Sequence, residues 1–109
     1  MELPLQVSFR NMDPSPAVEA RVREKAKKLE QYFSHLTSCR VVVEAPHRNH
    51  LKGNIYHVRI EMGVPRKPEL VVSNEREENH AHEDVYIAIR DAFATAQRQL
   101  RNYTEKMEG

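Results

Sequence analysis

The feature of this sequence that most constrains its fold is a long amphipathic stretch at residues 83–107. Its apolar side chains recur at intervals of three and four positions, which is the spacing of one buried face on an α-helix. These positions are Val85, Ile89, Ala92, Ala96, Leu100, Tyr103 and Met107. Because one apolar face needs a partner surface, the rest of the chain must supply an apolar layer on which this helix packs.

A second helix is predicted upstream, from Pro16 to about Phe33. The Ser15 hydroxyl can cap its first turn, and the fixed φ of Pro16 suits the first helical position. The predicted buried face of this helix consists of Val18, Val22, Ala26, Leu29 and Phe33.

Four segments have strand character. Residues 3–10 and 54–62 alternate apolar with polar side chains, residues 37–45 contain three consecutive valines, and residues 69–73 form a short apolar segment. The resulting order is β-α-β-β-β-α, an α+β fold. A right-handed crossover makes the first two strands parallel, and we expect both helices to pack on one face of a four-stranded sheet.

Length and composition are those of a single domain spanning residues 1–109, with 39% hydrophobic and 30% charged residues. No apolar run approaches the ~20 residues needed to cross a bilayer, and the amino-terminus lacks the pattern of a signal peptide. Cys39 is the single cysteine, which excludes a disulfide within the chain. We expect a cytoplasmic protein that does not bind membranes.

Charge is segregated along the chain although the net charge is only +1. Residues 21–28 hold five basic side chains and one acid, whereas residues 75–84 hold five acids and one arginine. A uniformly basic nucleic-acid binder is therefore excluded. Any binding to phosphate must depend on a local patch.

One flank of the first predicted helix carries Arg21, Lys25, Lys28 and Tyr32 at spacings of four, three and four, with no acid among them. Ammonium and guanidinium groups can hold phosphates while a phenol stacks on a base, so this flank is a candidate RNA-binding surface. A solvated helix face is the alternative interpretation. The opposite flank carries the i,i+4 pair Glu19 and Arg23, which is ordinary helix surface.

The polar flank of the last helix adds further basic candidates. Arg90 and Arg101 lie on it together with Gln97, and Arg98 lies further round towards solvent. The predicted loop at residues 46–53 supplies two more candidates, Arg48 and Lys52.

Catalytic and cofactor chemistry have little support in the sequence. The three glycines are not clustered, so no phosphate-binding loop is present, and no nucleophile motif is recognisable. The sharpest alternative is a zinc site formed by four loop histidines and an acid, but a short histidine pair in a loop is a weak pattern. Its ligands would be His47, His50, His80, His82 and Glu83. We expect no cofactor and no small-molecule substrate.

Two motifs carry a resemblance to a known family: KLEQYF at residues 28–33, and HEDVYIAIRDAF followed by RQL within residues 82–100. With them, the chain resembles the ribosome hibernation promoting factor and ribosome-associated inhibitor family, earlier named sigma-factor modulation proteins. The resemblance covers nearly the whole chain and includes the Asp-x-Tyr-x-Ala-Ile pattern at Asp84, Tyr86, Ala88 and Ile89. It implies a four-stranded sheet with two helices on one face, similar to a double-stranded-RNA-binding domain.

The resemblance implies binding to the small ribosomal subunit and its ribosomal RNA, in the channel that messenger and transfer RNA would occupy, so that translation stops without any reaction being catalysed. Family members contact RNA through basic helix residues, which correspond here to Lys25, Lys28, Arg98 and Arg101. The chain departs from the family at Arg90, where aspartate is common, and in the last turns of the final helix, where lysines are common.

A regulatory protein-interaction module is a different hypothesis, suggested by the older sigma-factor name. Its contact surface would comprise an exposed Ile87 and the acidic segment at residues 75–84.

Overall fold

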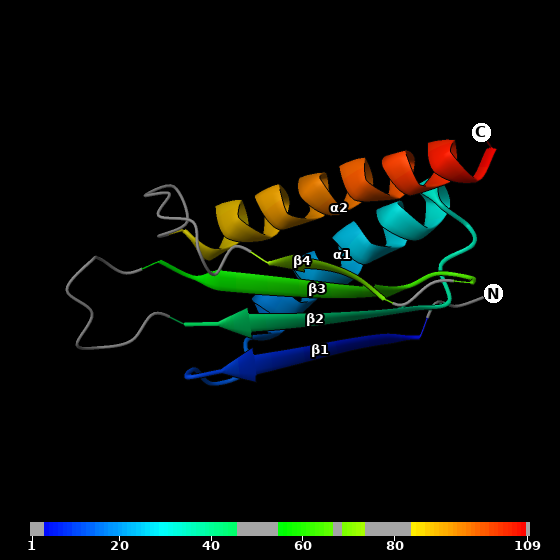
Figure 1. Ribbon diagram of the computed structural model, residues 1–109. Helices are drawn as coiled ribbons and strands as arrows, with labels where there is room; N and C mark the ends of the chain where they lie inside the picture. Colours follow the sequence, from blue (N-terminus) through cyan, green and yellow to red (C-terminus); the bar gives the residue numbers. More distant parts are fainter. Residues whose placement is uncertain (1–3, 46–54, 67–68, 74–83, 109) are drawn as a thin grey trace.

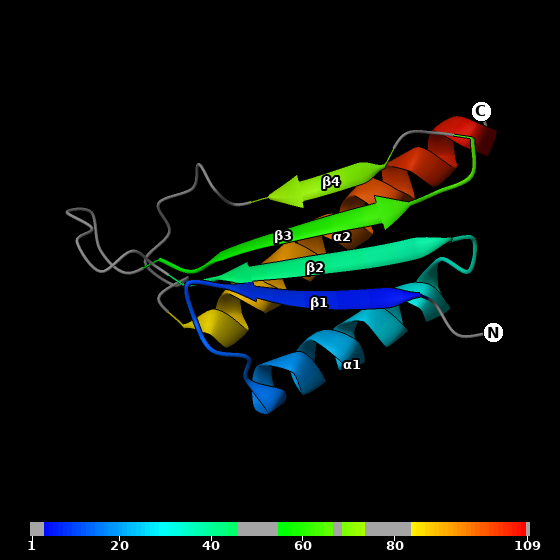
Figure 2. The same cartoon turned by 90° about the horizontal axis from the view of Figure 1, so that it is seen from below.

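Two helices lie on one face of a four-stranded sheet and leave the other face uncovered (Figures 1 and 2). The computed structural model describes residues 4–45, 55–66, 69–73 and 84–108, with side chains described as far as Tyr103 in the last range. The elements are β1 Leu5–Arg10, α1 Pro16–Tyr32, β2 Ser38–Glu44, β3 His57–Gly63, β4 Leu70–Ser73 and α2 Val85–Glu108. The predicted order β-α-β-β-β-α and the α+β class are confirmed.

The strands lie side by side in sequence order. β1 and β2 are parallel, with Leu5 opposite Cys39, because α1 returns the chain in a crossover between them. β2 with β3 and β3 with β4 are antiparallel pairs. The parallel first pair is the arrangement that the sequence predicts.

Helix ends follow from local capping. The Ser15 hydroxyl accepts a hydrogen bond from the Val18 backbone N–H at 3.3 Å, as predicted, and Pro16 occupies the first turn of α1. At α2 the Asp84 carboxylate accepts from the Tyr86 N–H at 2.9 Å. This capping carboxylate also lies at the positive end of the helix dipole, which its charge stabilises.

The core lies between the helices and the inner face of the sheet. All five positions of the predicted face of the first helix are buried, and so are Ile89, Ala92, Ala96, Leu100 and Tyr103 of the predicted face of α2. Val85 is half-buried, and the side chain of Met107 lies outside the described residues. Opposite the helices, β2 presents Cys39, Val41 and Val43, and β3 presents Val58, Ile60 and Met62. Burial raises the pKa of the Cys39 thiol to about 11, so it stays protonated at neutral pH and packs as a small apolar side chain.

Two buried residues of α2 extend the apolar face beyond the predicted set. Ala88 and Phe93 are 1% and 5% exposed. Phe93 lies four positions after Ile89, which is a helical spacing, but it also sits next to the polar flank. Phe93 therefore widens the buried face of α2 on the side towards α1, and Ala88 widens it on the opposite side.

The outer face of the sheet carries charges that are matched within the face. Glu61 lies 3.7 Å from Arg40 and 2.9 Å from Arg59, and Glu44 lies 3.8 Å from His57. Val71, on the edge strand β4, is 39% exposed on this face. No helix covers these side chains in the described part of the chain.

Candidate nucleic-acid interface

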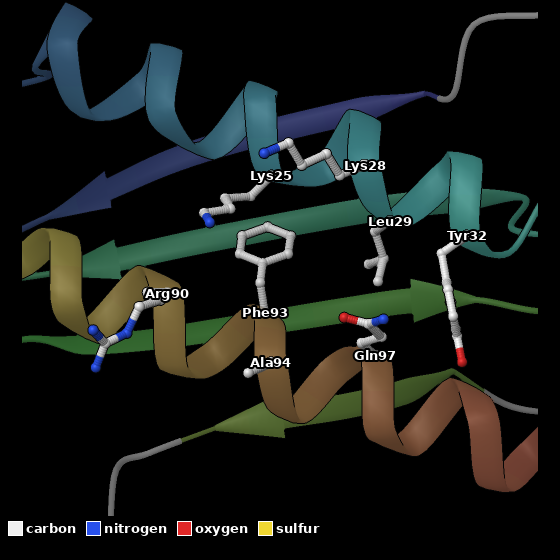
Figure 3. A pocket seen from close by; sticks show the side chains of 8 residues that line it. All are labelled: Lys25, Lys28, Leu29, Tyr32, Arg90, Phe93, Ala94 and Gln97. Atoms are coloured by element: carbon white, nitrogen blue, oxygen red, sulfur yellow. The ribbon is translucent and has the colours of Figure 1, made fainter.

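A groove with a cavity of about 410 Å³ runs between α1 and α2 (Figure 3). Both helices contribute four lining residues: Lys25, Lys28, Leu29 and Tyr32 from α1, and Arg90, Phe93, Ala94 and Gln97 from α2. Lys25 and Lys28 reach over Phe93, with Tyr32 at one end of the groove and Arg90 towards the other. Candidate residues from two distant parts of the sequence thus share one surface.

The helical period of α1 explains why its basic flank faces the groove. Val22, Ala26 and Leu29 point at the sheet, and the flank carrying Lys25 and Lys28 is roughly 100° away around the helix axis, on the side of α2. The opposite flank is occupied by the Glu19–Arg23 pair, with Nε and Oε2 at 3.2 Å. The two flanks are therefore different surfaces.

An arginine and a tyrosine meet at each end of the helix pair. Arg21 of α1 lies over the ring of Tyr86 of α2, 5.2 Å from its centroid. At the other end Nε of Arg101, from α2, donates to the phenol oxygen of Tyr32, from α1, at 3.1 Å. These contacts orient two guanidinium groups and two aromatic rings along the same side of the molecule as the groove.

Acids are few around the groove, but two approach its basic residues. Glu24 lies 4.0 Å from the Lys28 ammonium, so the flank predicted to be free of acid has one beside it, one turn away on the solvent side. Arg90 pairs with its neighbour Asp91 at 3.1 Å. Both pairs are solvent-exposed and offset little of the local positive charge. Lys25 has no acidic partner among the described residues.

One RNA-binding candidate among the described residues lies apart from the groove and its two ends. Arg98 is exposed on α2, where its Nη2 donates to the Thr95 hydroxyl at 3.2 Å. Arg48 and Lys52 lie outside the described residues. The structure therefore groups Arg21, Lys25, Lys28, Tyr32, Arg90 and Arg101 and separates Arg98 from them.

The floor of the groove was not foreseen from the sequence. The sequence pattern predicts Leu29 as a core residue and Gln97 as part of a polar flank, and it gives no indication that Phe93 and Ala94 line a groove. One clue was available, since Phe93 and Gln97 follow one another at a spacing of four on the flank that holds Arg90 and Arg101.

The zinc hypothesis falls on His47, His50, His80, His82 and Glu83, all of which lie outside the described residues. Within the described ranges, no three histidine, cysteine or acidic side chains come together in a way that could hold a metal ion. Among those same residues, neither helix combines the length and apolar character that crossing a membrane requires.

Comparison with known proteins decides the family. The sequence matches the family described as sigma 54 modulation protein / S30EA ribosomal protein over residues 5–108. The chain belongs to this family. The family is ribosome-associated, and neither of its two names describes an enzyme. The family resemblance expected from the sequence is confirmed.

Solved structures similar to this S30EA family member share its fold. A ribosomal subunit interface protein from Coxiella burnetii superposes with a TM-score of 0.70 at 12% identity, covering 94% of this chain and 99% of that chain. The Thermus thermophilus Protein Y N-terminal domain gives a TM-score of 0.63 at 18% identity, with the same coverage. No curated protein sequence matches the chain.

The protein-interaction hypothesis receives less support from the structure than the sequence suggested. Ile87, expected to be exposed, is half-buried, so it offers a smaller apolar contact surface. Of the acidic segment, only Asp84 is described, and its carboxylate is engaged in capping α2.

Proposed function

We propose that this protein is a translation inhibitor of the hibernation-factor type. It binds the small ribosomal subunit through ribosomal RNA and occupies the messenger and transfer RNA sites. It acts in the cytoplasm, without a cofactor and without catalysing a reaction. Membership of a ribosome-associated family supports the partner, and the charge distribution of the helix pair supports the surface.

The observation that carries the proposal is the joining of basic side chains from two helices on one side of the molecule. Lys25 and Lys28 of α1 and Arg90 of α2 line the same groove, and Arg21 and Arg101 stand beside its two ends. RNA presents closely spaced phosphates, so binding needs several cations on one surface rather than a high net charge. A solvated helix face would not require a matching basic flank on a second helix.

A pair of double variants tests this surface. Lys25→Glu with Lys28→Glu reverses two charges in the groove, whereas Arg23→Glu with Lys27→Glu reverses two exposed charges elsewhere on the same helix. The first pair should weaken binding to purified small subunits by about 100-fold or more, because two charge-assisted contacts become repulsive. It should also relieve inhibition of cell-free translation.

The second pair controls for net charge, which changes equally in both double variants. It should alter binding by less than about threefold, because Arg23 and Lys27 are exposed side chains that do not line the groove, and solvent and salt screen such charges. Circular dichroism and thermal unfolding must show that both variants are folded. Equal losses in the two variants would reject the groove as the RNA surface.

Salt dependence offers an independent measurement. Log affinity for the small subunit should fall linearly with log salt concentration, with a slope of roughly −0.7 to −0.9 for each phosphate contact. The groove double variant should reduce the magnitude of the slope by about 2, and the control should leave it unchanged. An affinity that does not respond to salt would indicate a protein partner.

A further inference from the structure

The groove has a feature that phosphate binding leaves unexplained, namely its hollow and apolar floor. A volume of about 410 Å³ falls within the range of roughly 300–1,000 Å³ typical of small-molecule sites. Leu29 and Phe93, which are 4% and 5% exposed, form part of this floor together with the Ala94 methyl group. Charged phosphate oxygens gain nothing from such a surface, whereas a flat aromatic group does.

The small side chain of Ala94 keeps the hollow open. Ala94 is exposed on α2, one turn after Arg90 and one turn before Arg98, and its methyl group lines the groove. Figure 3 shows Ala94 on the α2 side of the groove next to Phe93, so a longer side chain at this position would reduce the space over that side of the floor. Because the Ala94 side chain is short, the apolar floor stays accessible next to the basic side chains at the rim.

Polar and aromatic groups at the rim suit a nucleobase. The Gln97 amide lines the groove and can both donate and accept hydrogen bonds, as a base edge requires. The Tyr32 ring is 45% exposed and is held at one end by the hydrogen bond from Arg101 at 3.1 Å, so it offers a stacking face in a defined position. Lys25, Lys28 and Arg90 surround the opening and can hold phosphates on either side of the nucleotide.

We propose that the groove between α1 and α2 receives one unstacked nucleotide from a single-stranded segment of the bound RNA. Its base lies against Leu29, Phe93 and Ala94, its edge meets Gln97, and its flanking phosphates contact Lys25, Lys28 and Arg90. This inference rests on the proposed RNA-binding function and adds that the RNA bound at the groove is single-stranded. A duplex cannot place a base in the hollow because its bases are stacked and paired, whereas loops and bulges present unstacked bases.

The test fills the hollow without changing charge. Ala94→Leu places a larger apolar side chain in the groove, and leucine is a strong helix former at an exposed position. Ala20→Leu is the matched control, since Ala20 is also an exposed helical alanine but does not line the groove. Fluorescence anisotropy measures binding of the full chain to a single-stranded oligoribonucleotide, to its abasic counterpart with the same phosphates, and to a duplex of equal length.

Ala94→Leu should weaken binding to the base-containing strand about tenfold, within the range expected for losing one stacked base. Binding to the abasic strand and to the duplex should change by less than about twofold, because phosphate contacts remain. Ala20→Leu should leave all three unchanged. Lys25→Glu with Lys28→Glu should weaken binding to all three probes, which separates phosphate contacts from base insertion.

Other outcomes would separate failure of base insertion from failure of the proposed function. Equal affinities of wild type for the base-containing and abasic strands, or an Ala94→Leu variant identical to wild type, would overturn base insertion. The proposed function would survive that result if wild type still bound purified small subunits and the lysine reversals still abolished that binding. If free AMP or polyglutamate bound the groove more tightly than the single-stranded oligoribonucleotide does, RNA would not be the occupant of the groove. Failure of wild type to bind small subunits would instead reject the proposed function.

Discussion

The groove between the helices and the uncovered face of the sheet contain the same kinds of charged residue in opposite arrangements. On the sheet face, Glu61 lies within 4.0 Å of two arginines, and Glu44 lies 3.8 Å from His57. At the groove, Lys25 and Lys28 face Arg90 across an apolar floor, and the acids that approach lie outside its lining. The first surface is balanced locally and the second is not.

The distribution of charge over the surface, rather than the net charge, therefore indicates the kind of partner. A net charge of +1 is compatible with RNA binding because no acidic side chain is among the described residues that line the groove. Arg40 and Arg59 on the open sheet face offer phosphates less attraction, since both guanidinium groups already lie close to the Glu61 carboxylate. Substitutions at the groove and on the open sheet face should therefore have different effects on RNA binding.

The largest expected effect is on the free energy of unfolding, where a residue under the groove is compared with a residue on the open sheet face. Replacing Leu29, which forms both core and groove floor, with alanine should lower the free energy of unfolding by ~2–5 kcal/mol through lost burial and a residual cavity. Val71→Ala on the uncovered face should change it by less than about 0.5 kcal/mol. Denaturant unfolding measures both. If Leu29→Ala lowered the free energy of unfolding by less than about 0.5 kcal/mol, the burial of Leu29 between α1 and the sheet would be contradicted.

Charge reversal at two arginines of α2 tests how far the RNA-binding surface extends around this helix. Arg101→Glu should weaken binding to small subunits about tenfold, because it removes a cation and the hydrogen bond that positions Tyr32. Arg98→Glu changes net charge equally but should cost less than about threefold, since Arg98 lies outside the groove and contacts Thr95. Sedimentation with purified subunits compares them. Equal losses would extend the RNA surface round α2, as the family resemblance alone would suggest.

The balance on the sheet face can be broken deliberately. Glu61→Gln removes the carboxylate shared by Arg40 and Arg59, so two cations become available on an open surface. Non-specific binding to single-stranded RNA at low salt should increase by roughly three- to fivefold. Glu30→Gln, on the flank of α1 away from the groove, makes the same change in net charge and should have little effect. An equal gain in the two variants would mean that total charge governs binding.

The smallest effect is expected at the edge of the groove. Glu24→Gln removes the acid 4.0 Å from Lys28 and should tighten binding to small subunits by about twofold, because an exposed pair offsets only a fraction of the lysine charge. Glu30→Gln again serves as the control of equal charge. Titrations at two salt concentrations should show the gain shrinking as salt is raised. Weaker binding of Glu24→Gln would imply that Glu24 itself contacts the partner.

Much of the fold could be predicted from the sequence because its elements have strong local signals. The three- and four-residue spacing from Val85 to Tyr103 predicted α2, the Ser15–Pro16 pair predicted the start of α1, and the valines of β2 predicted a buried strand. Boundaries were less certain, since the third strand begins at His57 instead of residue 54. Strand ends depend on pairing with neighbours, which local patterns do not contain.

The candidate site was only half visible in the sequence. Helical periodicity alone places Arg21, Lys25, Lys28 and Tyr32 on one flank, because residues on one helix have a fixed angular relation. The family motifs added the expectation of a ribosomal partner. Neither source of information revealed that Phe93 and Ala94 form a hollow next to Lys25.

Local sequence patterns are enough to predict the elements, their order, the buried face of each helix and the separation of acidic from basic segments. They do not reveal that the basic flanks of α1 and α2 face one groove, that Tyr32 meets Arg101 across 69 positions of sequence, or that Arg98 lies outside the groove. Periodicity fixes directions around one helix axis only. The rotation and spacing of two helices relative to each other are set by how their side chains pack together on the sheet.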